Sequence, residues 1–347
     1  MNVKLGDFGG YQGFKEFVKQ WNGCPYKSAM ISLTYQCQCH CKHCGVGLFR
    51  KKNVKELSTI EIKNLILDRL QGCDLGTAYF FGGEPTLHED LVELIRYSTE
   101  KGLHTRFDTN GLKLADMNFV KAIKEVGYPF VYVSIDSADP EVHDRFREMK
   151  GVWKSAIQAI KNCVEMNIYV GISTVVTKQN LKRGDTKKII QLGKDLGVSM
   201  IRLLSPMLVG RWYKKDEVKL SKEEIKEFWS LLEPDFVFWD SEFCDGRRPF
   251  VCASSARWVI AITVYGDVQP CSYIPIRFGN IREEHLKNIL DRMWQSSYFK
   301  KINEMVERKN LVDCPMNDEN FRCKILRLTE GKHEYPVDYD ESVFSAE

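Results

Sequence analysis

Apolar segments alternate with amphipathic helical segments over the first two thirds of this chain. The segments that we predict as strands are 28–35, 77–81, 104–108, 130–135, 169–176 and 200–204. The helical patterns that follow are 60–70, 90–100, 119–126, 154–166 and 187–196. Because parallel strands need a long crossover connection, this alternation predicts an α/β fold whose parallel sheet is wound as a partial or complete barrel of six units.

The C-terminal third departs from this alternation. A capping box formed by Ser221 and Glu224 begins a helix, and the segment 259–269 predicts a β-hairpin about a Tyr-Gly-Asp turn. We therefore expect an N-terminal segment at 1–27, a barrel at 28–211, and a linker helix with a small α+β extension at 212–347.

Composition excludes several classes of partner. The net charge of +3 is spread over 50 basic and 47 acidic residues, which favours neither nucleic acid nor a membrane surface. The sequence shows neither a signal peptide nor an apolar run long enough to span a bilayer. We expect a cytoplasmic protein without membrane or nucleic-acid partners.

Twelve cysteines in such a chain indicate metal binding or catalysis before disulfides. Cys37, Cys41 and Cys44 form C-x3-C-x2-C directly after the first predicted strand. A structural zinc site uses four closed ligands, whereas three thiolates on a 4Fe-4S cube leave one iron open to another ligand. Three thiolates therefore favour a catalytic iron–sulfur cluster. We interpret Cys39, which lies outside the motif, as a thiol that does not bind the cluster.

A second motif follows the second predicted strand, which runs into Gly82-Gly83-Glu84-Pro85. Glycines allow a ligand to approach the backbone closely, and Glu84 offers a carboxylate to a cationic group. Ligands of open α/β sheets bind at the carboxyl ends of the strands, where both motifs fall.

These motifs resemble those of the radical S-adenosylmethionine (SAM) enzymes. C-x3-C-x2-C, GGEP, "DTNG" (108–111) and "VSIDSADPEVHDRFR" (133–147) occur in the order of that family. The resemblance implies a six-unit partial (β/α) barrel with a C-terminal extension. It also implies a 4Fe-4S cluster that cleaves SAM reductively to a deoxyadenosyl radical, which abstracts hydrogen from a substrate.

The resemblance assigns roles residue by residue. Cys37, Cys41 and Cys44 would hold the cluster, and Arg147 would pair with the carboxylate of SAM. The other residues expected near SAM are His43, Gly82, Gly83, Glu84, Pro85, Ser134 and Asp136. Two alternatives stay open: Arg147 as a solvated helix residue, and Ser134 or Asp136 as caps of the helix that starts near Pro140.

A second cysteine group resembles the SPASM and Twitch extensions of this family, which bind auxiliary 4Fe-4S clusters. The motif C-x13-G-x4-C followed by "GNI" runs from Cys252 to Ile281. The expected ligands of one auxiliary cluster are Cys252, Cys271, Cys314 and Cys323. Cys244 is a substitute ligand or a hydrogen donor, and a structural zinc would satisfy the same thiols.

The resemblance leaves several substrates open. We expect modification of a ribosomally made peptide or protein, with a one-electron donor such as flavodoxin or ferredoxin and a separate leader-binding protein as partners. The alternatives are a dehydrogenase, epimerase or decarboxylase of a sugar, aminocyclitol or tetrapyrrole, and a zinc-binding interaction protein without catalysis.

Overall fold

The computed structural model describes residues 27–51, 53–213, 215–239, 252–307, 314–332 and 335–345. Its main element is a ten-stranded sheet in the order β11-β9-β8-β1-β2-β3-β4-β5-β6-β7. Its strands are β1 (Ser28–Thr34), β2 (Thr77–Gly82), β3 (His104–Thr109), β4 (Phe130–Ser134), β5 (Val170–Val175), β6 (Met200–Leu204), β7 (Val237–Trp239), β8 (Val259–Ile262), β9 (Asp267–Gln269) and β11 (Gly279–Asn280). A small second sheet pairs β10 (Ile276–Arg277) with β12 (Val337–Asp338).

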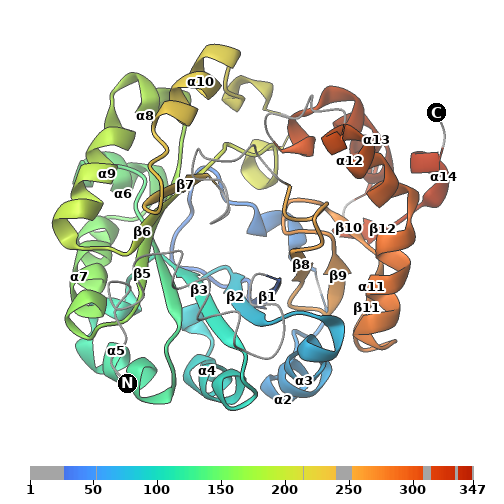
Figure 1. The fold of residues 1–347 in the computed structure, drawn as a ribbon, viewed down its shortest axis with the longest axis horizontal. Helices are drawn as coiled ribbons and strands as arrows, with labels where there is room; N and C mark the ends of the chain where they lie inside the picture. The colour runs from blue at the N-terminus through green and yellow to red at the C-terminus, as the bar shows by residue number, and fades with distance from the viewer. Residues whose placement is uncertain are drawn as a thin grey trace.

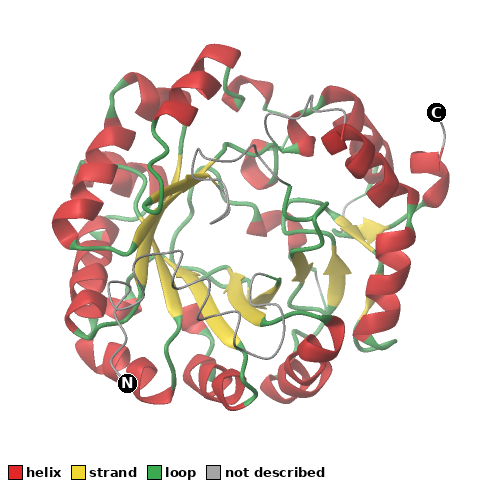
Figure 2. Cartoon of the chain, in the orientation of Figure 1, coloured by secondary structure: helices red, strands yellow, loops and turns green. Residues whose placement is uncertain are grey.

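Helices form an outer layer around the curved sheet (Figures 1 and 2). They are α2 (Thr59–Glu61), α3 (Asp68–Leu70), α4 (Leu91–Glu100), α5 (Met117–Val126), α6 (Pro140–Arg147), α7 (Val152–Glu165), α8 (Lys178–Lys182), α9 (Asp185–Leu196), α10 (Lys222–Ser230), α11 (Leu286–Gln295), α12 (Ser297–Glu307), α13 (Glu319–Thr329) and α14 (Glu341–Ser345). A π-helical segment, Ile62–Leu67, joins α2 to α3. No helix within the described ranges has the length and apolarity to cross a bilayer.

The predicted α/β partial barrel is confirmed. Strands β1 to β6 pair in sequence order, each parallel to the next. Their apolar side chains and the inner faces of the helices form one main hydrophobic core. Capping boxes at Ser58 and Ser221 begin α2 and α10 as the sequence indicates.

Two features of the sheet differ from expectation. The short strand β7 pairs parallel to β6, so the parallel order continues past the point where we expected it to stop. The predicted C-terminal hairpin forms from β8 and β9, but β8 also pairs parallel to β1. Because β8 satisfies the free backbone groups along one edge of β1, the C-terminal extension continues the barrel sheet.

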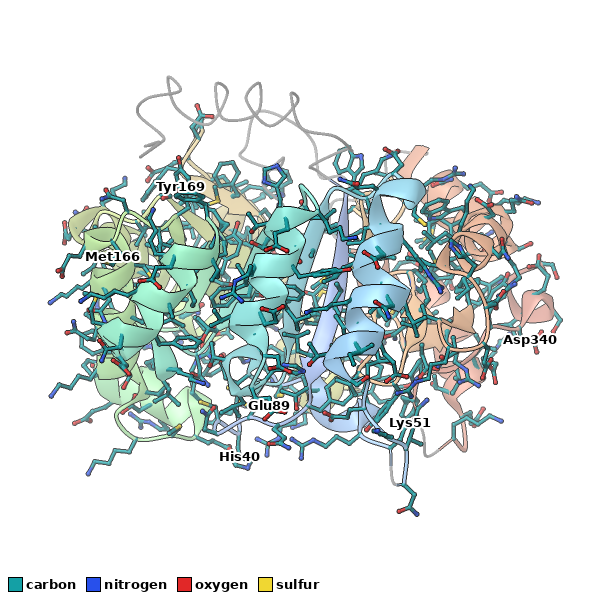
Figure 3. The ribbon with its side chains drawn as sticks, turned by 90° about the horizontal axis from the view of Figure 1, so that it is seen from below. His40, Lys51, Glu89, Met166, Tyr169 and Asp340 are labelled. Atoms are coloured by element: carbon teal, nitrogen blue, oxygen red, sulfur yellow. The ribbon has the colours of Figure 1, made fainter. Side chains whose placement is uncertain are left out.

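The carboxyl ends of the strands meet at one end of the barrel. Figure 3 shows His40, Lys51 and Glu89, which lie in or beyond the loops after β1 and β2, at the same end of the molecule. Met166 and Tyr169, which precede β5, lie at the opposite end. The cysteine loop and the GGEP segment therefore share the face of the sheet where α/β proteins bind ligands.

Candidate active site

The cysteine loop leaves β1 and packs against the end of α6. The backbone N–H of His40 donates to the carbonyl of Arg147 at 3.1 Å, and that of Lys42 donates to Phe146 at 3.0 Å. Cys39 and Cys41 are buried with Val152, and Cys37 and Cys44 pack partly buried against the same small cluster. All four thiols of the loop therefore lie together in a largely apolar setting.

The four thiols differ in their affinity for protons. Hydrogen bonding from Cys39 lowers the pKa of Cys37, and the same thiol, helped by Arg147, lowers the pKa of Cys41 to about 7. Burial raises the pKa of Cys44. The pKa of Cys39 is raised far above its usual range because its thiol is hydrogen-bonded to both neighbours. Cys39 thus behaves as a protonated neighbour of Cys37 and Cys41, which agrees with its place outside the motif.

His43 lies in an aromatic setting beside the loop. Its ring stacks on that of Phe146, with the ring centroids 5.1 Å apart, and its centroid lies 5.8 Å from that of Trp212. Burial lowers the pKa of His43 to about 4, so its imidazole is neutral at physiological pH. Its Nδ1 atom is buried and has no hydrogen-bond partner among the described residues. A buried polar atom without a partner at the predicted cofactor site fits a ligand that supplies one.

Gly82 and Gly83 approach the protein backbone that enters the cysteine loop. A Cβ atom on Gly83 would lie 2.2 Å from the carbonyl oxygen of Gln36, and one on Gly82 would lie 2.4 Å from that of Thr34. The N–H of Gly83 donates to Thr34 at 2.8 Å, and the N–H of Glu84 donates to Gln36 at 2.8 Å. The glycines therefore let the end of β2 hold the start of the loop in place.

We predict that Gly83→Ala displaces this loop, because the added methyl group overlaps a carbonyl oxygen. Overpacking of this kind costs about 1–3 kcal/mol or more. The variant should unfold at a lower Tm and bind less iron after anaerobic reconstitution. Gly72→Ala is the matched control, since a Cβ there meets nothing within 4 Å. A Gly83→Ala protein with the Tm and iron content of the unsubstituted chain would contradict the prediction.

Glu84 contacts the protein itself on both carboxylate oxygens. Oε1 accepts from the hydroxyls of Thr86 and Thr109, both at 2.7 Å, and Oε2 accepts from the N–H of Asn110 at 2.7 Å. The side chain is buried, and burial raises its pKa. Glu84 thus joins the ends of β2 and β3, a positioning role that its sequence motif did not indicate. Pro85 begins the buried turn that follows.

Asp136 and Arg147 form a buried ion pair behind the cysteine loop. Arg147 Nε donates to Asp136 Oδ2 at 2.8 Å, and the two side chains are 8% and 2% exposed. Burial would raise the pKa of Asp136, but Arg147, with His43 and His143, holds it below its ordinary value. Arg147 is therefore not a solvated helix residue. It has further N–H donors, so this ion pair leaves it able to bind a second anion.

The helix that follows β4 is capped by a different residue from the two that we considered. The side chain of Asp139 accepts from the backbone N–H groups of Glu141 and Val142. Asp136 instead accepts from the N–H of Val175 at 3.2 Å and so links the ends of β4 and β5. Ser134 is the last residue of β4 and is half-buried. The capping alternative is wrong for both Ser134 and Asp136.

A cavity of about 200 Å³ opens between the barrel and the C-terminal extension. Its walls come from the cysteine loop, the ends of β1, β2, β3, β5 and β6, and the segment after β9. His43 and Gly45 line one side, and Ser272 and Tyr273, which follow Cys271, line another. The cavity therefore lies between the two predicted cysteine sites.

The C-terminal extension brings three of its four predicted ligands together. Cys252, Cys271 and Cys314 pack partly buried against the main core. Burial and the nearness of these three thiols raise the pKa of the fully buried Tyr298 well above its usual range. Cys323 lies on α13 and is exposed, unlike the other three. Cys244 lies outside the described residues.

We predict that Cys314 and Cys323 differ in their effect on iron binding. Cys314→Ser should lower the iron content of the reconstituted chain from about eight to about four atoms, since one 4Fe-4S cluster is lost. Cys323→Ser, its partner in the same segment, should keep about eight. Iron and sulfide analysis decides the matter, and equal losses in both variants would show that Cys323 also binds the cluster.

The donor sets of both sites consist of cysteine thiols. Soft thiolate ligands of this kind suit iron–sulfur clusters. Within the motif triad, hydrogen bonding from Cys39 lowers the pKa of Cys37 and Cys41, which favours the thiolate form that binds a metal.

The fold and the two cysteine sites define a class of iron–sulfur enzymes built on an α/β partial barrel. Residues 31–191 match the model of the radical SAM superfamily, and residues 252–323 match that of an iron–sulfur cluster-binding domain named SPASM. The chain belongs to the radical SAM superfamily, and its cofactors are SAM and 4Fe-4S clusters, including an auxiliary one. The zinc alternative is therefore wrong for the C-terminal site.

Similar proteins act on different substrates. An Fe-coproporphyrin III synthase of Methanosarcina barkeri is 36% identical over 201 residues, which are 58% of this chain and 49% of that protein. The chain thus spans about half the length of this relative. An AdoMet-dependent heme synthase of the same organism is 27% identical over 80% of this chain and 84% of its own length. A PqqA peptide cyclase of Bradyrhizobium diazoefficiens is 25% identical, with coverages of 78% and 73%.

The fold is also similar to that of a solved protein bound to a precursor peptide. Streptococcus suis SuiB, bound to the precursor peptide SuiA, superimposes with a TM-score of 0.61 at 15% identity. The match covers 95% of this chain and 79% of SuiB. At this identity the likeness establishes the arrangement of barrel and extension.

Some site residues were missed by the sequence analysis. Trp212 and Tyr273 line the cavity, whereas the neighbouring Tyr213 hydrogen-bonds Thr329 at 2.6 Å. Asp108 and Arg202 meet inside the barrel and had no assigned role. A charged residue in the middle of the apolar strand "MIRLL" was the available signal for Arg202.

Proposed function

We propose that this radical SAM enzyme abstracts a hydrogen atom from one side chain of a ribosomally made peptide or protein. The cavity carries the proposal. It has a volume of about 200 Å³ and lies beside both the cysteine loop and the segment after Cys271, so a substrate there would lie near both predicted clusters. An opening between barrel and extension can admit one side chain of a longer peptide, and a PqqA peptide cyclase is among the similar proteins.

We assign the roles within this site as follows. Cys37, Cys41 and Cys44 would hold the catalytic cluster, and Cys252, Cys271 and Cys314 the auxiliary one. Bound SAM supplies, after one-electron reduction, the radical that removes hydrogen from the substrate. The residues that would contact SAM or support its site are His43, Gly82, Gly83, Glu84, Pro85, Ser134, Asp136 and Arg147. We place the boundary between the barrel and the auxiliary-cluster region near residue 211.

The chain's own side chains give the site its properties. The Asp136–Arg147 pair and the backbone bonds from α6 fix the cysteine loop. The aromatic group of His43, Phe146 and Trp212 excludes water beside it. The position of the cavity between the two cysteine sites would let the auxiliary cluster accept an electron from the substrate. A flavodoxin or ferredoxin would supply the reducing electron, and a separate protein would bind the leader of the peptide.

The relatives favour a second candidate, a tetrapyrrole substrate. Two of the similar proteins are named as synthases of haem or Fe-coproporphyrin III, and both exceed the peptide cyclase in identity.

Labelled substrates separate the two candidates. The reconstituted enzyme, SAM and dithionite are incubated with peptides from the source organism grown on deuterated amino acids. Deuterium in the deoxyadenosine, measured by mass spectrometry, shows abstraction from a peptide. A parallel reaction contains Fe-coproporphyrin III. Its decarboxylation, without label transfer from the peptides, would establish the tetrapyrrole candidate instead.

A further inference from the structure

Asp108 is the only acidic residue among the described residues that line the cavity. It stands on β3 near the strand's carboxyl end, and its side chain is 31% exposed. The rest of the lining is mostly apolar or aromatic, and His43, the one imidazole there, is neutral. A carboxylate in such a wall favours a cation or a hydrogen-bond donor beside it over an apolar or anionic group.

Arg202, which does not line the cavity, forms an ion pair with this carboxylate. Its Nη2 atom donates to both oxygens of Asp108 at 2.8 Å, and the guanidinium lies 4.0 Å from the centre of the Tyr132 ring. The remaining donors of Arg202 are also engaged. Nε donates to Ser173 Oγ at 3.3 Å, and Nη1 donates to the hydroxyl of Tyr79. The Arg202 side chain is 9% exposed and does not line the cavity.

One carboxylate oxygen of Asp108 can accept a further hydrogen bond. Oδ1 accepts from Arg202 and from the Tyr79 hydroxyl at 2.8 Å, whereas Oδ2 accepts from Arg202 alone among the described residues. A carboxylate oxygen accepts two hydrogen bonds. Oδ2 therefore retains an acceptor position, and Asp108 lines the cavity.

We propose that Asp108 is a specificity-determining residue that accepts a hydrogen bond from an ammonium or other N–H group of the substrate. This inference rests on the proposed function, since it names the side-chain chemistry that the cavity selects. A cation or N–H donor satisfies Oδ2, while a carboxylate at the same place would meet a like charge with no donor to offset it. Tyr79, Arg202 and Ser173 position Asp108 and do not contact the substrate.

Small probes of equal shape test this selection on the reconstituted enzyme. n-Butylammonium, n-butanol and butyrate are titrated while tryptophan fluorescence is recorded, because Trp212 lines the cavity. The Trp212→Phe variant shows which part of the fluorescence change comes from Trp212 in the cavity. We expect saturable binding of butylammonium, about tenfold or more tighter than that of butanol, and none of butyrate. Tighter binding of butyrate, or no saturable binding of butylammonium, overturns the proposal.

Variants tie the selection to Asp108. Asp108→Asn alone leaves the buried Arg202 without its anion and risks misfolding. The double variant Asp108→Asn, Arg202→Met removes both charges, and the new amide oxygen still accepts from Tyr79. It should bind butylammonium and butanol equally while its circular dichroism and iron content match those of the parent. A preserved preference in this folded variant would overturn the proposal.

The same preparations separate this inference from the proposed function. Deoxyadenosine formed by the unsubstituted enzyme from SAM and dithionite reports radical chemistry, and label transfer from peptides reports the substrate. Butylammonium selection with decarboxylation of Fe-coproporphyrin III would leave the cavity chemistry in place and overturn peptide modification. Label transfer from peptides without butylammonium selection would do the reverse.

Discussion

Cys41→Ala should reduce deoxyadenosine formation to the level of a reaction without protein. In the structure Cys41 is the central thiol of the motif, buried beside Arg147, and its pKa is lowered to about 7. Alanine offers no ligand, so the catalytic cluster has only two thiolates left from the motif. Iron should fall from about eight to about four atoms per chain, because the auxiliary cluster remains.

Cys39→Ala is the matched control for this prediction. Cys39 lies two residues away in the same loop and is similarly buried, but it stands outside the C-x3-C-x2-C motif. Its replacement should preserve about eight irons and deoxyadenosine formation. Iron and sulfide analysis, with chromatography of the nucleoside products, measures both variants. Deoxyadenosine from Cys41→Ala, or its loss from Cys39→Ala alone, would show that the ligands are assigned wrongly.

The parallel barrel could be predicted because its determinants are local. Apart from β3, each of the strands β1 to β6 is short and rich in apolar residues, and the helices between them carry their own apolar stripes and caps. The cysteine loop and the GGEP segment were found for the same reason, since each is contiguous in sequence. The strand β7, only three residues long, offers too few positions for a periodic pattern.

The roles of the charged residues depend on contacts between distant elements. Glu84 was expected to face a cation, but its partners are donors at the ends of β2 and β3 that only the sheet register brings within reach. Arg202 and Asp108 are 94 positions apart and meet because β3 and β6 face each other across the barrel. Cys323 follows the ligand pattern in sequence, yet α13 turns it to the exposed side.

Arg147→Ala should destabilise the protein and weaken SAM binding together. The substitution leaves Asp136 buried and without its cationic partner, which costs about 3–5 kcal/mol in comparable buried pairs. A loss of this size lowers Tm by several degrees or more. The pKa of Asp136 should rise, because burial then acts with less opposition. Once protonated, the Asp136 carboxyl of the variant no longer carries the cost of an unpaired buried charge. The difference in the free energy of unfolding between variant and parent should therefore shrink as the pH falls from 7 toward 5.

Two variants separate the ion pair from the cofactor contact. Arg145→Ala removes an exposed arginine from the same helix and should change neither Tm nor SAM affinity. Asp136→Asn with Arg147→Met removes both buried charges and should recover most of the Tm, since no unpaired charge remains. If Arg147 also binds the carboxylate of SAM, this double variant still binds SAM weakly in equilibrium dialysis. Restored SAM affinity in the double variant would limit the role of Arg147 to holding the cysteine loop. An unchanged Tm in Arg147→Ala would contradict the stabilising role of the buried ion pair.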